Sequence, residues 1–208
     1  MREEMHRLLA WRLVAFSFAL VDSAYAFASI KALPDFRNKP CRPSLPGLSR
    51  ISLFMAMKVN IRIVGRKAGS EKWLEEACLM YETRLRPYNL EVETTWHKDN
   101  EALIRGVETD RSKGHSVVLL DPLGKVRSSE QLSEDIYKWL HQGGSRLSFV
   151  IGGAEGLPVE LKEGLHGASP PNQLSLSALT FTHQFARLLL MEQIYRASEI
   201  RKGSGYHK

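Results

Sequence analysis

The chain has 208 residues, 43% of them hydrophobic, which suits one domain with a buried core plus an extension. Its net charge is +6, but residues 1–50 hold +4 of it and residues 51–56 none, which leaves +2 for residues 57–208. Global basicity is therefore weak evidence for a nucleic-acid partner, and such a contact needs a local patch. The two cysteines, Cys41 and Cys78, match no metal-ligand spacing and argue against a disulfide framework. We expect a reduced compartment, no metal, and a buried Cys78.

Residues 1–56 show no regular alternation of strands and helices and are expected to be an N-terminal extension. Their longest uncharged apolar piece, residues 13–21, is too short to cross a bilayer, so no membrane contact is predicted. A basic start, an apolar centre and Ala24-Tyr25-Ala26 fit a secretory signal as one alternative. Residues 31–50 add Arg, Lys, Pro and Ser with a single acid, which favours an organelle transit peptide. A chloroplast is the favoured destination and a mitochondrion the alternative.

From Met57 onward the sequence alternates between strand-like and helix-like segments. Residues 58–64 and 90–96 alternate apolar and polar positions, as half-buried strands do. Residues 116–120 form a continuous apolar run, which is typical of a strand buried on both faces. Two further strands are predicted at residues 147–151 and 173–176.

The segments between and after these strands have the periodicity of helices. Helices are predicted between Ser70 and Pro87, over 101–107, from Ser128 or Ser129 to Gly143-Gly144, over 158–165 and over 183–201. The first is expected to place Trp73, Ala77, Met80, Tyr81 and Leu85 on one face. The last is apolar around much of its circumference, which burial or a partner surface would explain equally well. Five strands alternating with five helices predict an α/β fold, a parallel sheet flanked by helices.

Three loops, residues 120–125, 151–156 and 176–181, each follow a predicted strand. Ligands of parallel sheets bind beyond the carboxyl ends of the strands, so we expect these loops to form one composite pocket. The glycines of the second loop fit neither a Rossmann nor a P-loop spacing, but they allow backbone to touch a flat ligand. A plain tight turn is the alternative there, as it is for Asp121-Pro122. The third loop can offer amides and leucine faces to an adenine, or be an ordinary connection.

Taken in order, the motifs of residues 57–208 resemble the RlmH family of SPOUT-class RNA methyltransferases nearly end to end. The matching pieces are Met57-Lys58 with Gly65, Leu120-Asp121 with Gly124-Lys125, Ile151-Gly152-Gly153 with Glu155-Gly156-Leu157, Ser175 to Thr180 with His183, Arg187, Tyr195-Arg196-Ala197, and Tyr206-His207. The chain departs from the family pattern at Ala154, where Pro is usual, at Phe181-Thr182, which replace Leu-Pro, and at Lys208, which replaces Arg.

The resemblance implies a SPOUT-type domain with a C-terminal trefoil knot, and a homodimer with each active site near the interface. It implies S-adenosyl-L-methionine as cofactor. The implied cofactor-binding residues are Leu120, Gly152, Gly153, Leu176, Ser177, Ala178, Leu179, Thr180 and Phe181. The implied substrate is a pseudouridine of large-subunit ribosomal RNA, within an assembled ribosome, methylated on N3.

The catalytic candidates lie at or near the last helix and at the C-terminus. His207 or His183 is expected to accept the N3 proton, directly or through water. Arg196 and Arg187 are expected to hold phosphate or stabilise a developing anion, and Tyr206 to stack on or orient the base. Two alternatives stay open: a SPOUT methyltransferase acting on another RNA site, such as a ribose oxygen, and a non-catalytic ribosome-assembly protein that binds RNA.

Overall fold

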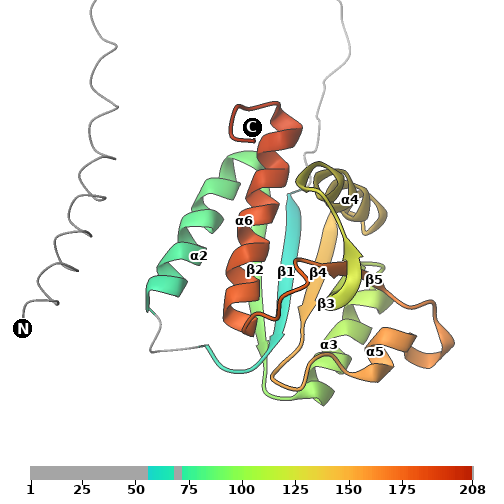
Figure 1. Cartoon of the computed structure of the whole chain (residues 1–208). Coiled ribbons are helices and arrows are strands. Elements are labelled where there is room, and N and C mark those ends of the chain that lie inside the picture. Colours follow the sequence, from blue (N-terminus) through green and yellow to red (C-terminus); the bar gives the residue numbers. More distant parts are fainter. Residues whose placement is uncertain (1–55, 68–71, 208) are drawn as a thin grey trace, which may run out of the picture. The chain divides into compact units, whose positions relative to one another are not determined.

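The computed structural model describes residues 56–67 and 72–207. In this part five parallel strands form a sheet in the order β2-β1-β4-β3-β5, accompanied by five α-helices (Figure 1). The strands are β1 Met57–Val64, β2 Leu90–His97, β3 Ser116–Val126, β4 Arg146–Ile151 and β5 Asn172–Ser175. The helices are α2 Lys72–Leu85, α3 Asn100–Ser112, α4 Ser129–Gln142, α5 Val159–Glu163 and α6 His183–Lys202. The predicted parallel α/β fold is confirmed, whereas strand order does not test the knot, which stays a prediction.

Several predictions concern residues outside this part of the chain. They are the transit peptide within residues 1–55, the helix cap at Ser70 and the departure from the family pattern at Lys208. Within the described residues, no helix combines the length and apolar character that crossing a membrane requires.

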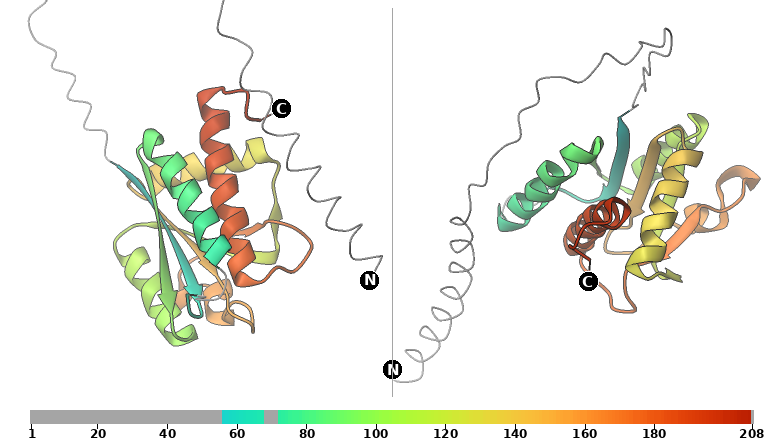
Figure 2. Two further views of the ribbon diagram at one scale, coloured as in Figure 1. Left: turned by 90° about the vertical axis from the view of Figure 1, so that its left-hand side faces the viewer. Right: turned by 90° about the horizontal axis from the view of Figure 1, so that it is seen from above.

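The sheet is covered by helices on both faces (Figures 1 and 2). Helices α2, α4 and α6 pack with one another over one face, and α3 packs against β1 and β3 on the other. The buried apolar residues form two clusters, and β3 contributes to both. Val118 and Leu120 belong to the larger cluster, and Val117 and Leu119 to the smaller one. The continuous apolar run predicted for a doubly buried strand is therefore confirmed.

Helix α2 faces the core differently from the prediction. Its buried residues are Leu74, Cys78 and Leu85. Trp73 is 53% exposed and Met80 is 40% exposed, so the predicted face is wrong for these two, whereas Leu85 is buried and Tyr81 packs against the core as predicted. The stripe of α2 that contains Leu74 and Cys78 packs against the core, and the neighbouring stripe with Trp73 and Met80 stays exposed. Trp73 instead packs edge-on against Phe185 of α6, with ring centroids 5.9 Å apart.

Exposed apolar side chains thus gather where α2 and α6 lie next to each other. Trp73, Met80 and Phe185, each at least 40% exposed, are here called the α2–α6 apolar surface. The apolar circumference of α6 is partly explained by burial, since Leu190, Met191 and Ile194 are buried. Ala186 and Leu188 pack against the same core, and Phe185 is left exposed, as expected for a surface that a partner covers.

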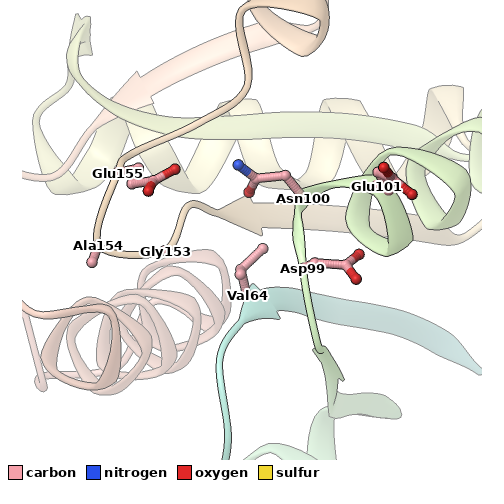
Figure 3. A pocket seen from close by; sticks show the side chains of 7 residues that line it. All are labelled: Val64, Asp99, Asn100, Glu101, Gly153, Ala154 and Glu155. Atoms are coloured by element: carbon pink, nitrogen blue, oxygen red, sulfur yellow. The ribbon is translucent and has the colours of Figure 1, made fainter.

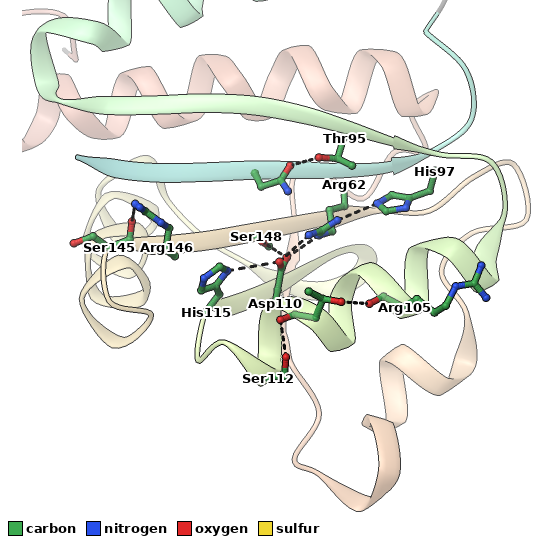
Figure 4. A network of polar contacts seen from close by, with 12 residues as sticks. Arg62, Thr95, His97, Arg105, Asp110, Ser112, His115, Ser145, Arg146 and Ser148 are labelled. Atoms are coloured by element: carbon green, nitrogen blue, oxygen red, sulfur yellow. Dashed lines mark hydrogen bonds and ion pairs between the residues drawn. The ribbon is translucent and has the colours of Figure 1, made fainter. Parts of the chain in front are cut away.

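A buried polar network fixes α3 to the sheet (Figure 4). Arg62 of β1 donates two hydrogen bonds to Asp110 of α3, at 2.6 and 2.7 Å, and Ser148 of β4 donates a third at 2.5 Å. Burial acts to raise the pKa of Asp110, but the hydrogen bonds from Arg62 and Ser148 leave it lowered, so the carboxylate is ionised. A Cβ atom at Gly106 would lie 2.7 Å from Arg62 Nη1, so glycine is what lets α3 approach this closely.

Two helix starts position the site. Ser128, rather than Ser129, caps α4 in a reciprocal arrangement with Gln131. Thr182 caps α6 by accepting a hydrogen bond from the Phe185 amide, so the departure from the family pattern at this position supplies a cap. Helix α6 therefore begins at His183, directly after the third loop.

Candidate active site

The three predicted loops meet around one cavity of about 410 Å³. It lies beyond the carboxyl ends of β4 and β5, as expected for a parallel sheet, and beside the middle of β3 at Leu120 to Pro122. The predicted cofactor-binding residues that line it are Leu120, Gly152, Gly153, Leu176, Ser177, Leu179, Thr180 and Phe181. Ala178 belongs to the same loop but not to the lining. All three predicted segments thus contribute to one cavity, although the first, residues 120–125, belongs to β3 rather than to a loop; the cofactor site itself stays a prediction.

The loop after β4 folds back tightly on itself. A Cβ atom at Gly152 would lie 2.3 Å from the carbonyl carbon of Gly156 and 2.6 Å from the amide nitrogen of Leu157. Gly156 has φ +82°, a conformation that L residues with side chains rarely adopt. The glycines therefore hold bare backbone against the cavity, where a flat ligand can approach it.

A buried carboxylate forms part of the wall. Asp121 Oδ2 lies 2.6 Å from Lys162 Nζ, and Asp121 Oδ1 accepts a hydrogen bond from the Leu123 amide at 2.9 Å. Burial acts to raise the pKa of Asp121, but the bonds from Lys162 and Leu123 leave it lowered. Asp121 is thus both the turn former weighed above and an ionised group at the cavity. Lys162 was not predicted, because it comes from α5 and belongs to no motif of the sequence.

His183 lines the same cavity from the first turn of α6. It packs between two neighbours. A Cβ atom at Gly65 would lie 3.2 Å from His183 Nε2, and the Trp96 ring meets the imidazole edge-on at 6.3 Å. This packing limits the rotation of the ring and keeps it beside the loops.

Arg187 lies one turn further along α6 but is buried, with only 3% of its side chain exposed. Its Nη1 lies 2.9 Å from Glu75 Oε1, and its guanidinium carbon is 5.4 Å from the centre of the Trp96 ring. Arg187 was expected to hold phosphate or stabilise a developing anion, but it is paired with Glu75 and is not among the residues that line the cavity. Arg187 supports the Trp96 ring, which in turn contacts His183.

Arg196, Tyr206 and His207 gather further along α6. Arg196 Nη2 lies 2.5 Å from Glu192 Oε1, and the Arg196 guanidinium carbon is 4.9 Å from the centre of the Tyr206 ring. His207 Nε2 lies 2.7 Å from Glu130 Oε1 at the start of α4. Hydrogen bonds from Ser128 and His207 lower the pKa of Glu130 to about 2, so this carboxylate is ionised. The C-terminal tail is packed on the domain.

One chain does not bring all the catalytic candidates together. Tyr206 lies against Glu192, since its hydroxyl is 3.3 Å from Glu192 Oε1. Nine residues of helix separate His183 from Glu192, which is about 14 Å along the helix axis. His183 is at the cavity, whereas Arg196, Tyr206 and His207 are not among its lining residues.

A second cavity, of about 500 Å³, adjoins the glycine loop (Figure 3). It shares Gly153 and Ala154 with the first cavity and carries the carboxylates of Asp99, Glu101 and Glu155. These negative charges repel phosphate groups. Among the described residues, no group of three or more His, Cys, Asp or Glu side chains is arranged to hold a metal ion.

The chain is similar to known proteins over the same stretch. Residues 57–207 match the family described as "Predicted SPOUT methyltransferase". Ribosomal RNA large subunit methyltransferase H of Protochlamydia amoebophila is 47% identical over 152 residues, which cover 73% of this chain and 99% of that protein. The protein of the same name from Syntrophomonas wolfei is 35% identical, over 73% of this chain and all of its own length.

Among solved structures, a probable methylase family protein from Haemophilus influenzae aligns with 72% of this chain and 70% of its own. That alignment has 14% identity and a TM-score of 0.43, and it adds nothing to the assignment. The family match and the two close relatives are sufficient: the chain belongs to the SPOUT methyltransferases, in the RlmH group.

Proposed function

We propose that this protein transfers a methyl group from S-adenosylmethionine to N3 of a pseudouridine in large-subunit ribosomal RNA. The two relatives described above, which align with this chain over almost their whole length, are named ribosomal RNA large subunit methyltransferase H. The observation that carries the proposal is the convergence of the three family loops on one cavity. The target nucleotide and the assembled subunit as partner rest on the resemblance. The low net charge of residues 57–208, +2, also suits binding to a folded ribosomal subunit better than binding to free RNA.

The cavity fits the cofactor that the family uses. Its volume, about 410 Å³, falls in the range of small-molecule sites. Leu120, Leu176 and Leu179 provide apolar surface for an adenine, and the glycine loop provides backbone groups. The ionised Asp121 suits a ligand that carries positive charge on sulfur and on its amino group. The cofactor supplies an electrophilic methyl group, and this chemistry needs no metal.

The residues of the chain then have to deprotonate and orient the base. His183 and His207 are the two proposed proton acceptors, of which His183 lies at the cavity. His207 Nε2 lies within hydrogen-bond distance of the ionised Glu130, and Nδ1 is buried with no hydrogen-bond partner in the described part of the chain. Tyr206 is proposed to stack on the base and Arg196 to neutralise developing negative charge.

A homodimer would bring these groups together. The α2–α6 apolar surface is exposed in one copy, and a two-fold dimer buries the same surface on both copies. If the axis passes near Leu188 and Leu189, in the first half of α6, positions equally far from the crossing face each other. His183 of one copy then meets the level of residues 193–195 of the other, where Tyr206 packs. We propose that each site combines His183 from one copy with the tail of the other.

Mixed dimers test this arrangement. His183→Ala and His207→Ala, each inactive alone, are co-expressed as full chains with different tags. If each site draws on both copies, a mixed dimer keeps one intact site, so random pairing restores about a quarter of wild-type activity. If His183 and His207 act within one chain, no pairing restores activity. Two variants that each retain near-normal turnover would refute both histidines as bases.

The function itself is tested with cofactor carrying a trideuterated methyl group. Purified full-length protein is incubated with large ribosomal subunits that lack the modification, and the RNA is digested and analysed by mass spectrometry. The proposal predicts one heavy methyl on the base of a pseudouridine. A heavy methyl on a ribose oxygen would identify another RNA site. Failure to bind the cofactor in calorimetry would favour the non-catalytic ribosome-assembly protein.

We also propose that residues 1–56 are a transit peptide that directs the protein to the chloroplast. The family match begins at residue 57, so this extension lies outside the part shared with the relatives. Its composition, rich in Arg, Lys, Pro and Ser towards residue 50, supports the proposal. A ribosome inside the organelle would then supply the substrate.

A further inference from the structure

A third cavity, of about 530 Å³, lies between α4 and the β3–β5 pair and is here called the β5 groove. It is lined by Leu123, Gly124, Lys125, Arg127, Asp135, Lys138, Trp139, Pro170, Pro171, Asn172, Gln173 and Leu174. None of its side chains belongs to the cofactor or catalytic candidates. Leu174 and Trp139, 2% and 7% exposed, are its most buried side chains, whereas Leu123 is 90% exposed.

The groove concentrates positive charge. Lys125, Arg127 and Lys138 line it against a single acid, Asp135, which pairs with Arg127 at 2.8 Å. Lys125 and Lys138 form no ion pair with the described residues and are exposed to solvent. The charged residues of the groove carry a net charge of +2, which equals the net charge of residues 57–208. The charges of the other residues in this range therefore sum to zero. This is the local patch that a nucleic-acid contact requires, and global charge did not reveal it.

The groove adjoins the cofactor cavity through a thin wall. Asp121 and Pro122 line the cavity, the next three residues along β3 line the groove, and Leu174 of β5 lines both. A Cβ atom at Gly124 would lie 2.8 Å from the backbone of Leu174, so the wall is two strands in close contact. A chain molecule with one unit near the cavity therefore reaches the groove with its next units.

We propose that the β5 groove binds the phosphate backbone of the substrate RNA beside the target nucleotide. The inference rests on the proposed function and adds to it the surface along which the RNA leaves the site. Lysine ammonium groups are compact donors well suited to phosphate oxygens. The acidic cavity at Asp99 and Glu155, which adjoins the glycine loop, disfavours a path in its direction. The RNA therefore leaves the cofactor cavity towards the β5 groove and away from the acidic cavity.

Charge reversal tests the groove. Lys125→Glu and Lys138→Glu are made in the full-length protein, together with Lys138→Arg, which keeps the charge. The matched control is Lys113→Glu, an exposed lysine at the end of α3 on the other face of the sheet. Methyl transfer to large subunits is measured against subunit concentration at several salt concentrations. Cofactor affinity and Tm are measured alongside.

For each groove reversal we expect the KM for subunits to rise roughly tenfold and the salt slope of binding to fall by about one, with cofactor affinity and Tm unchanged. Lys138→Arg and Lys113→Glu should match the wild type. Groove reversals that behave like Lys113→Glu would overturn the proposal while leaving the proposed function intact. A subunit-binding defect with an unchanged salt slope would also overturn it, since the lysines would then not contact phosphate groups. A wild-type protein that transfers no methyl group would refute both the groove proposal and the proposed function.

Discussion

Replacing Gly152 by alanine tests whether the tight loop after β4 builds the cofactor site. The new methyl group would lie 2.3 Å from the Gly156 carbonyl carbon and 2.4 Å from its oxygen, both backbone atoms, so the loop itself has to move. Forcing extra volume into a packed site costs about 1–3 kcal/mol. For a domain of this size, that corresponds to a Tm lower by roughly 2–12 °C. A displaced loop should also weaken cofactor binding by about tenfold or more, because the backbone that lines the cavity is what shifts.

The assay is calorimetric titration with S-adenosylmethionine beside thermal unfolding of the same variant. Gly114→Ala is the matched control. Gly114 also has positive φ, +75°, but has nothing within 4 Å of the added atom and lies outside the cavity lining. The control should lose about 1–2 kcal/mol through backbone strain and keep its cofactor affinity. A Gly152→Ala variant with wild-type affinity and Tm would show that the loop accommodates a side chain, and the reasoning would fail.

Three further predictions follow from the fold and the extension. Asp110→Ala leaves the Arg62 guanidinium buried without a carboxylate, so unfolding should need about 3–5 kcal/mol less in denaturant titrations; a loss below 1 kcal/mol would contradict this. Burial and the Arg62 charge lower the pKa of His97 in the folded protein. Below the ordinary pKa near 6.5, His97 is therefore protonated more in the unfolded chain than in the folded one. Stability should therefore fall as pH drops from 7 to 5, and less so in His97→Gln; equal slopes would contradict the assignment. A fluorescent protein fused behind residues 1–56 should enter chloroplasts in plant cells, and cytosolic or mitochondrial signal would refute that destination.

The alternation of strand and helix was predictable because each element carries its own periodicity. The loops at residues 151–156 and 176–181 were predictable too, since each follows an apolar run that reads as a strand, whereas residues 120–125 belong to β3. Strand β3 was predicted too short: it continues past Asp121 to Val126 and pairs with β5 again after a register shift between Leu120 and Lys125. Pro122 and Gly124 read as turn residues, and they lie in the irregular stretch between Leu120 and Lys125, which both pair with Leu174.

Contacts between distant elements were not predictable. Arg62 occupies a polar position of β1 that alternation assigns to solvent, yet α3 covers that face and supplies Asp110. A glycine inside α3, Gly106, was the available signal, because glycine within a helix often marks close packing. The face of α2 was predicted wrongly for a related reason: two apolar stripes were present, and packing chose Leu74 and Cys78. The partner of Arg187 likewise lies on α2, beyond any pattern of α6.

A crystal structure of the full-length protein with S-adenosylmethionine would test the central claim most directly. The account predicts the ligand between the glycine loop and the leucines at positions 120, 176 and 179, with its adenine against backbone groups and His183 nearby. Ligand density in the acidic cavity beside Asp99, or loops too far apart to touch one ligand together, would contradict it.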